Sequence, residues 1–157
     1  MRVLVFSDSH GGYNNIESAL LRHPDIREVV FLGDGLRDIE KAIENHPERR
    51  FFCDSGNCDF DITTPDVRLE NFGGAKFFLT HGHRYSVKES LLSLFLAGKE
   101  RDCRAILFGH THQPLTDFKE GVLMLNPGSV GGRGARKATY AIIDISESGI
   151  CPNILEL

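Results

Sequence analysis

Five short clusters of metal-ligand residues are spread along this chain of 157 residues. Each cluster contains glycine and follows an apolar run or a short loop after one, and five of the seven histidines fall within them. Asp, Asn and His side chains offer the oxygen and nitrogen atoms that divalent cations bind. The pattern therefore predicts a hydrolytic site that holds two metal ions. The clusters are Asp8-Ser9-His10-Gly11, Gly33-Asp34, Gly56-Asn57-Cys58-Asp59, His81-Gly82-His83 and Gly109-His110-Thr111-His112.

The first three clusters follow segments that are predicted to be β-strands. Three apolar segments, Arg2–Phe6, Glu28–Leu32 and Arg50–Cys53, alternate with two helical ones, Asn14–Leu21 and Leu36–Glu44. This alternation is typical of βαβ units and a mostly parallel sheet. In such a sheet the loops after neighbouring strands meet at one edge, where ligands bind. We therefore expect the three clusters to converge.

The second half of the chain is richer in predicted strands. Val67–Phe72 and Lys76–Thr80 flank Gly73-Gly74 and predict a hairpin. A helix is expected over Ser86–Lys99, with Ser86 as the N-cap and Glu89 three residues later. Two facing sheets with helices outside fit this order, although the pattern alone leaves α/β and α+β open. The remaining strands are expected at Ala105–Phe108, Leu115–Phe118, Val122–Leu125, Ala138–Ile145 and Ile150–Leu155.

In order and spacing, the five clusters resemble the motifs of the calcineurin-like metallophosphoesterase superfamily, from Met1 to about Tyr140. Its small bacterial and archaeal phosphodiesterase branch shares the sequences GNCD, THGH, GHTH and NPGS, the last being Asn126–Ser129 here. The resemblance implies a four-layer αββα sandwich, in which two facing mixed β-sheets are flanked by helices, as a single domain over residues 1–157. It also implies a metal-dependent phosphodiesterase, in which a hydroxide bridging two metal ions attacks phosphorus.

The same resemblance divides the ligands between two divalent metal ions. Asp34 would bridge them, since each oxygen of a carboxylate can bind one ion. Mixed oxygen and imidazole ligands accept several metals, so manganese is expected first, with nickel, iron, cobalt and zinc as alternatives. One ion would be held by Asp8, His10, Asp34 and His112, and the other by Asp34, Asn57, His81 and His110.

Cys58 departs from the wider superfamily, in which a histidine after the asparagine often protonates the leaving oxygen. A thiol, with an ordinary pKa of about 8.5, matches that role poorly at neutral pH. The sequence therefore favours phosphodiesters over unactivated phosphomonoesters. Whether Cys58 or Asp59 helps the leaving group stays open. The residues expected to act in catalysis are Asp34, Asn57, His81, Cys58 and Asp59.

Two further segments are expected near the metal ions. His83 is expected to orient a ligand by hydrogen bonding or to face the substrate. Asn126–Ser129 is expected to shape the pocket floor with backbone N–H and Ser129 hydroxyl donors. The basic cluster Arg133–Lys137 is expected to be a solvated loop, with attraction of an anionic substrate as the alternative.

Composition argues against several other classes of protein. The net charge of −4 does not favour broad binding of nucleic acid or of anionic membranes. No apolar run approaches the ~20 residues of a membrane-spanning helix, and no secretory segment is recognisable near the start. We therefore expect a cytoplasmic protein that acts on a small-molecule phosphodiester, with self-association left open.

Two other functions are carried as alternatives. A phosphomonoesterase is the nearer one, and the residue at Cys58 counts against it. The more distant one is a non-catalytic metal-binding scaffold, because a retromer subunit shares the fold implied by the resemblance but has lost ligands. Here every ligand position is filled.

Overall fold

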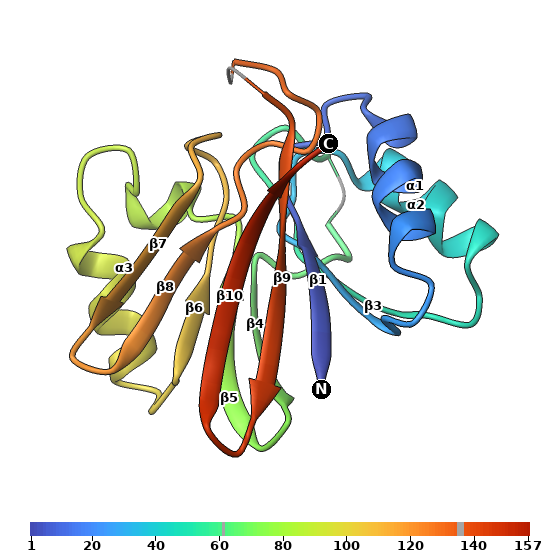
Figure 1. The fold of residues 1–157 in the computed structure, drawn as a ribbon. Helices are drawn as coiled ribbons and strands as arrows, with labels where there is room; N and C mark the ends of the chain where they lie inside the picture. The colour runs from blue at the N-terminus through green and yellow to red at the C-terminus, as the bar shows by residue number, and fades with distance from the viewer. Residues whose placement is uncertain (61, 135–136) are drawn as a thin grey trace.

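The computed structural model describes residues 1–60, 62–134 and 137–157. Two five-stranded sheets face each other, with two helices on the outer face of one sheet and one α-helix on the outer face of the other (Figure 1). Both sheets are mixed, because each combines parallel and antiparallel neighbours. The four-layer αββα sandwich implied by the resemblance is therefore confirmed.

The first sheet and its helices consist of β1 (Arg2–Phe6), α1 (Tyr13–Arg22), β2 (Glu28–Phe31), α2 (Leu36–Asn45), β3 (Arg50–Cys53), β9 (Thr139–Ser146) and β10 (Gly149–Glu156). The strand order is β10-β9-β1-β2-β3. The strands β1, β2 and β3 are parallel, as their alternation with helices predicted, whereas β9 and β10 add antiparallel strands at the other side. Because α1 and α2 connect parallel neighbours, they cover the outer face of this sheet.

The second sheet and its helices consist of β4 (Val67–Phe72), β5 (Ala75–Thr80), the 3₁₀ helix η1 (His83–Tyr85), α3 (Leu92–Lys99), β6 (Ala105–Leu107), β7 (Leu115–Lys119) and β8 (Val122–Asn126). The strand order is β4-β5-β6-β8-β7. The central strands β5, β6 and β8 are parallel, and β4 and β7 are antiparallel edges. The predicted hairpin at Gly73-Gly74 joins β4 to β5.

The helix expected to begin at Ser86 begins at Leu92 instead. Ser86 has a φ of 51°, in the left-handed region, and it ends η1 rather than starting an α-helix. The N-cap of α3 is Leu91, which makes no side-chain capping bond, and one residue earlier Ser90 Oγ accepts a hydrogen bond of 3.2 Å from the N–H of Leu92. Val87 still packs against the outer face of the second sheet, but from a turn.

Side chains of the central strands alternate between two hydrophobic layers. In β1, Val3 and Val5 face the space between the sheets, whereas Leu4 and Phe6 pack against α1 and α2. The same alternation in the second sheet places Phe78 against the layer under α3. Both faces of each central strand are therefore buried, which explains why these strands read as unbroken apolar runs.

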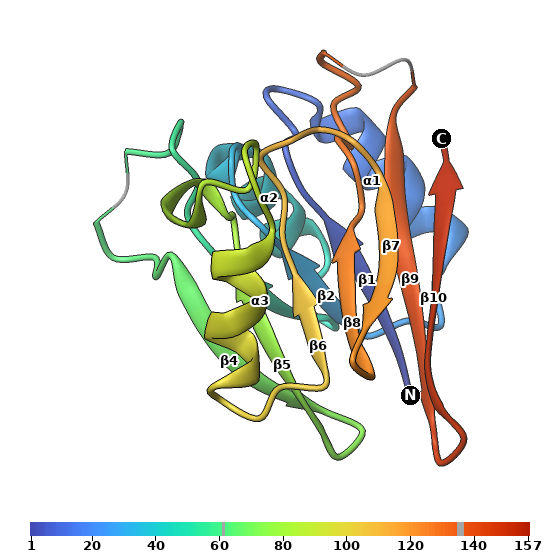
Figure 2. The ribbon, with the colours of Figure 1, turned by 90° about the vertical axis from the view of Figure 1, so that its left-hand side faces the viewer.

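The two sheets bring the carboxyl ends of six strands to one end of the molecule. Each sheet contributes three parallel strands, and Figure 2 shows β1 and β8 running toward the same end. The loops at this end are joined across the sheets, since the N–H of Val130, after β8, bonds to the carbonyl of Ser7, after β1, at 3.0 Å. All five clusters follow strands that end here.

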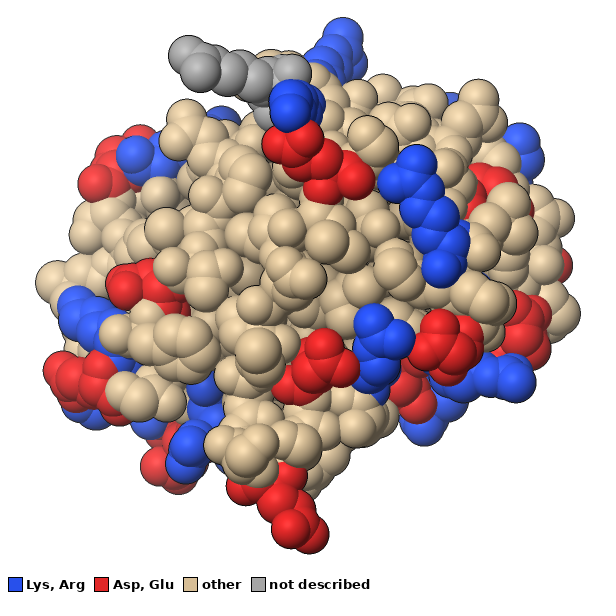
Figure 3. Space-filling model, in the orientation of Figure 1, with Lys and Arg blue, Asp and Glu red and all other residues tan. Residues whose placement is uncertain are grey.

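The outer surface is mixed in charge. On the face seen in Figure 3, basic and acidic side chains of the described residues are interspersed around a broad region that carries neither. Within the basic cluster, Lys137 pairs with Glu156 at 2.5 Å, and Arg136 lies outside the described residues. Among the described helices, none is long and apolar enough to cross a membrane.

A buried carboxyl at the end of β3 makes the stability of the fold depend on pH. Asp54 is fully buried, its two oxygens have no hydrogen bond of good geometry, and Arg68 Nε lies 3.4 Å from Oδ1. Burial raises the pKa of Asp54 from 3.8 to about 7, against the opposing effect of Arg68. Because the folded-state pKa is the higher one, the folded chain binds this proton more tightly than the unfolded chain. Stability is therefore lost as the pH rises from about 4 to about 7.

We predict that Asp54→Asn removes this pH dependence. The variant should be more stable than the wild type by a margin that grows between pH 4 and pH 7 and is constant above, because the amide cannot ionise. Guanidinium unfolding of both proteins, with chelator present, measures the margin at each pH. Asp117→Asn, at an exposed position on β7, is the matched control. A margin that does not change with pH would contradict the role assigned to Asp54.

Candidate metal centre

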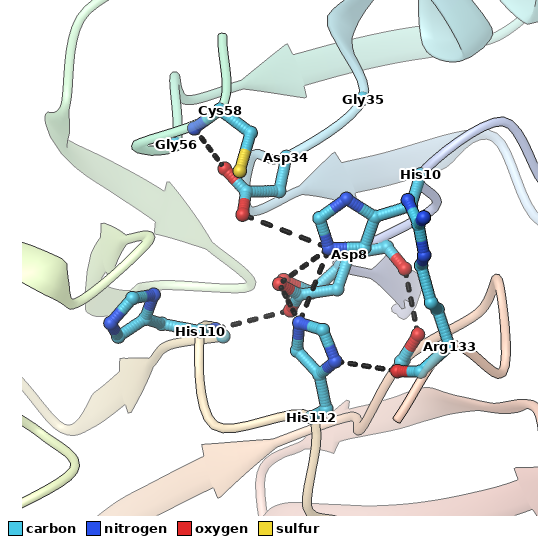
Figure 4. Close-up of polar contacts among 12 residues, drawn as sticks. Asp8, His10, Asp34, Gly35, Gly56, Cys58, His110, His112 and Arg133 are labelled. Carbon is cyan, nitrogen blue, oxygen red and sulfur yellow. Dashed lines mark hydrogen bonds and ion pairs between the residues drawn. The ribbon is translucent and has the colours of Figure 1, made fainter. Parts of the chain in front are cut away.

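The structure brings the predicted ligands together at the end of the molecule where the six strands end. In Figure 4, Asp8, His10 and His112 point toward one another, with Asp34 beside them. Three sets of side chains each place one ligand atom per residue within 4.8 Å of the others: Asp8, His10 and His112; Asp34, His81 and His110; and His10, Asp34 and Cys58. The first two are the ligand sets that the resemblance grouped in the same way, the third shares a residue with each of them, and the division between two ions stays a prediction.

Asp8 offers one carboxylate oxygen that has no hydrogen bond. Its Oδ2 accepts hydrogen bonds from Ser7 Oγ at 2.6 Å and from the N–H of His110 at 3.1 Å. Its Oδ1 is buried, makes no hydrogen bond of good geometry to any residue that the structure describes, and lies 3.0 Å from Nε2 of His112. A buried carboxylate oxygen without a partner is costly. A cation bound beside Oδ1 would remove that cost, so the site fits a metal ion.

Two histidines are held in the tautomer that metal binding requires. His81 Nδ1 lies 2.7 Å from the carbonyl oxygen of Leu32, and His112 Nδ1 lies 2.6 Å from that of Arg133. A carbonyl oxygen can only accept, so both Nδ1 atoms must donate. When either ring is neutral, its Nε2 then presents a lone pair to the centre, the arrangement seen in metal-binding histidines.

Several predicted ligand atoms lie within hydrogen-bonding distance of one another. His10 Nε2 and His112 Nε2 are 3.2 Å apart, and His110 Nδ1 and His81 Nε2 are also 3.2 Å apart. Asp34 Oδ2 lies 3.4 Å from His81 Nε2 and 3.8 Å from His10 Nε2, so this carboxylate stands between the two sets. Converging lone pairs and carboxylate oxygens of this kind are stabilised by cations.

The protonation states also suit metal ions. Burial opposes the charge of Asp34, yet hydrogen bonds from His81 and from the N–H of Cys58 hold its pKa well below the usual range. Burial lowers the pKa of His110 to about 4, helped by the charges of His81 and Lys88. At neutral pH, Asp34 is therefore ionised and His110 is neutral, which are the forms that bind metals.

The ligand loops are held in a strained backbone conformation. Five predicted ligands have positive φ values, a region that non-glycine residues rarely adopt and that costs ~1–3 kcal/mol each. Gly56 permits the close approach of two of these loops, because a Cβ there would lie 2.1 Å from Oδ1 of Asp34. Strain of this kind is characteristic of functional sites. The values are 55° for Asp8, 45° for His10, 60° for Asp34, 67° for His110 and 58° for His112.

Asp59 holds two ligand loops together rather than facing a substrate. Its carboxylate accepts four backbone N–H bonds, which tie the loop after β2 to the loop after β3. With both oxygens engaged in this way, Asp59 positions the two loops, and a part of Asp59 in the departure of the leaving group stays a prediction. The donors are Asp34 at 2.8 Å and Gly35, Leu36 and Gly56 at 2.9 Å.

The NPGS segment, Asn126–Ser129, makes hydrogen bonds to the loops that carry the predicted ligands and does not form the floor of a substrate pocket. Ser129 is fully buried, and its Oγ donates to the carbonyl oxygen of Asp8 at 2.7 Å. Asn126 Nδ2 donates to the carbonyl oxygen of Gly109 at 2.9 Å and to Thr111 Oγ1 at 3.0 Å. The expected role of the Ser129 hydroxyl as a donor to substrate is therefore corrected.

Asn57 and Cys58 lie at the rim of the centre. Asn57 Oδ1 is 3.1 Å from Nε2 of His81, so it joins the second set of ligands. Cys58 is exposed, and its sulfur lies with ligand atoms of His10 and Asp34 inside 4.8 Å. Burial and the hydrogen bond to Asp34 raise the pKa of the Cys58 thiol. The thiol is therefore protonated at neutral pH and is a weaker acid than usual.

His83 stands beside the ligand histidines. Its ring centroid lies 5.5 Å from that of His81 and 6.2 Å from that of His110. Its Nδ1 is buried without a hydrogen-bond partner among the described residues. The prediction that His83 orients a ligand by hydrogen bonding finds no such bond within that part of the chain, and a role toward the substrate stays a prediction.

Sequence and structure comparisons agree with this site. The sequence profile of the calcineurin-like phosphoesterase superfamily domain matches residues 1–148. The probable metallophosphoesterase YsnB of Bacillus subtilis is 33% identical over 148 residues, covering 92% of this chain and 85% of that protein. The phosphodiesterase YfcE of Escherichia coli is 30% identical over 171 residues, covering 92% of this chain and 88% of that protein.

Solved structures share the fold. A predicted phosphoesterase from Streptococcus pneumoniae superimposes with a TM-score of 0.84 at 28% identity, covering 99% of this chain and 88% of that one. Vps29 from Entamoeba histolytica, complexed with zinc, superimposes with a TM-score of 0.80 at 19% identity and covers 99% of each chain. At that identity the likeness to Vps29 shows the fold alone.

We predict that Asp34→Asn weakens the binding of both metal ions together. The substitution keeps the size of the side chain but removes the negative charge that stands between the two sets of ligands. Titration calorimetry with manganese should show both affinities falling by ~10-fold or more. Asp117→Asn should leave both unchanged. Loss of one ion with normal binding of the other would show that Asp34 does not serve both.

Proposed function

Because the chain belongs to the calcineurin-like phosphoesterase superfamily, we propose that it hydrolyses phosphodiester bonds with the help of two divalent metal ions. The observation that carries this proposal is the pair of ligand sets on either side of Asp34. Relatives named phosphodiesterases, which align with most of this chain, support the choice of ester.

Seven side chains would hold the metal ions. When bound, two cations would polarise the phosphoryl group and lower the pKa of an attacking water. Asp34 would serve both ions, and Asp59 would keep the two loops that carry Asp34 and Asn57 at a fixed separation. One ion would take Asp8, His10, His112 and Asp34, and the other Asp34, Asn57, His81 and His110.

A pocket beside the centre offers room for the leaving group. It has a volume of about 640 Å³ and is lined by His10, Asp34, Arg37 and Cys58 among others. Cys58 occupies the sequence position after the asparagine, at which the wider superfamily often has a histidine that protonates the leaving oxygen. Since the pKa of the Cys58 thiol is raised, little proton transfer is available at neutral pH. The site therefore favours esters whose leaving group is stable without a proton.

The two alternatives are weaker. Phosphomonoester hydrolysis usually needs more help for the leaving alkoxide, and Cys58 supplies little. The scaffold function is less supported, because relatives at 30% identity or more are named phosphoesterases and every ligand position here is filled. The preference for manganese, the cytoplasmic location, the single-domain organisation and self-association stay predictions.

The proposed function is tested with purified protein, manganese and a panel of nitrophenyl phosphomonoesters and phosphodiesters. We expect hydrolysis of diesters to exceed that of the matched monoesters, and chelation with EDTA to abolish it. Because the apolar layers between strands and helices stabilise the fold, the far-UV circular dichroism should stay nearly unchanged on chelation. Hydrolysis that survives complete removal of metal would contradict the metal-dependent reaction, and a preference for monoesters would favour the alternative.

A further inference from the structure

A second pocket lies against the loop that carries His110 and His112, and nothing in the proposed reaction uses it. It has a volume of about 410 Å³, within the range of small-molecule sites. Its wall includes Thr111, which lies between the ligands His110 and His112 in sequence, so the pocket and the centre share a loop. In Figure 2 the chain that leads into α3 lies at the same end of the second sheet as the ends of β6 and β8.

The lining of this pocket is mostly apolar. Val87 and Leu91 come from the turn before α3, Phe108 follows β6, and Leu115 begins β7. All four pack in or against the hydrophobic layer between α3 and the second sheet. The surface left open is therefore suited to a flat or branched apolar group, because burying it removes apolar area from water.

Among the described residues that line this pocket, Lys88 is the one that carries a charge. The exposed lysines Lys99 and Lys137 pair with carboxylates, whereas no ion pair holds Lys88 within the described part of the chain. The pocket thus combines an apolar wall with one cation that is free to meet an anion.

The geometry of an in-line displacement assigns the two pockets different parts of a diester. The attacking oxygen and the leaving oxygen lie on opposite sides of phosphorus, so the ester group that is kept leaves the centre in another direction. The pocket lined by Cys58 lies on the side of His10 and Asp34, where the leaving group is expected. The pocket lined by Lys88 instead lies against Thr111, between His110 and His112 in the sequence.

We propose that the pocket lined by Val87, Lys88 and Leu91 binds the ester group that stays on phosphorus, and that this group is an aromatic or branched apolar one carrying an anionic substituent. The inference rests on the proposed phosphodiesterase function and names the class of substrate. Apolar contacts would hold the body of the group, and the Lys88 ammonium would bind its anionic end.

Three diesters that share the 4-nitrophenolate leaving group test this assignment. They differ only in the group that is kept: methyl, phenyl or 4-carboxyphenyl. For the wild type we expect kcat/KM to rise in that order. Lys88→Ala should reduce the preference for carboxyphenyl over phenyl by about tenfold, the loss expected for one charge-assisted hydrogen bond. Leu91→Trp, which fills the pocket, should reduce the preference for phenyl over methyl.

A matched control and a second readout complete the test. Lys119→Ala removes one exposed lysine from the far end of β7 and should change neither preference. Thermal unfolding checks that each variant is folded. Unchanged preferences in both Lys88→Ala and Leu91→Trp would overturn the assignment.

Binding without turnover separates this inference from the proposed function. Calorimetry with manganese and 4-carboxyphenyl phosphate, the product that keeps the substituent, needs no hydrolysis. Suppose that the wild type hydrolyses none of the diesters but binds this compound about tenfold more tightly than Lys88→Ala does. The binding role of the pocket would then be supported, and the phosphodiesterase function would be rejected. Equal binding by the two proteins would overturn the pocket.

Discussion

The candidate centre depends on one topological constraint, that the parallel strands of two separate sheets end at the same end of the molecule. Asp8 follows β1, Asp34 follows β2, His81 follows β5 and His110 follows β6. Both faces of these strands are buried, so each strand end is fixed by packing on two sides. The packing of the hydrophobic layers therefore fixes where the predicted ligands lie, and the loops direct each side chain toward the candidate centre.

That turning has an energetic cost, and the surrounding polar contacts offset it. Ligands with positive φ values and a buried, unpaired Oδ1 on Asp8 are unfavourable in isolation. The four backbone bonds to Asp59 and the bond from Ser129 to Asp8 hold the loops in place. Metal ions would offset the remaining electrostatic cost by neutralising the carboxylates. The side chains of the site are therefore arranged to bind cations.

Much of this was predictable from the sequence, and the exceptions share a cause. Strands with buried faces were located because their apolar runs are continuous, and the ligands because Asp, Asn and His recur with glycine after such runs. The role of Asp59 was not predictable, since its acceptor function depends on the N–H of Asp34, 25 residues away. The start of α3 was misplaced because Ser86 adopts a left-handed φ and ends η1 instead of starting an α-helix. Neither a bond to a distant residue nor a left-handed φ at a serine is visible in the local sequence pattern.

The central claim, that Asp34 lies between two metal ions, is tested most directly by anomalous diffraction from crystals grown with manganese. The account predicts two anomalous peaks, one among Asp8, His10 and His112 and one among Asn57, His81 and His110, with the Asp34 carboxylate in contact with both. A single peak, or two peaks of which Asp34 contacts only one, would contradict it.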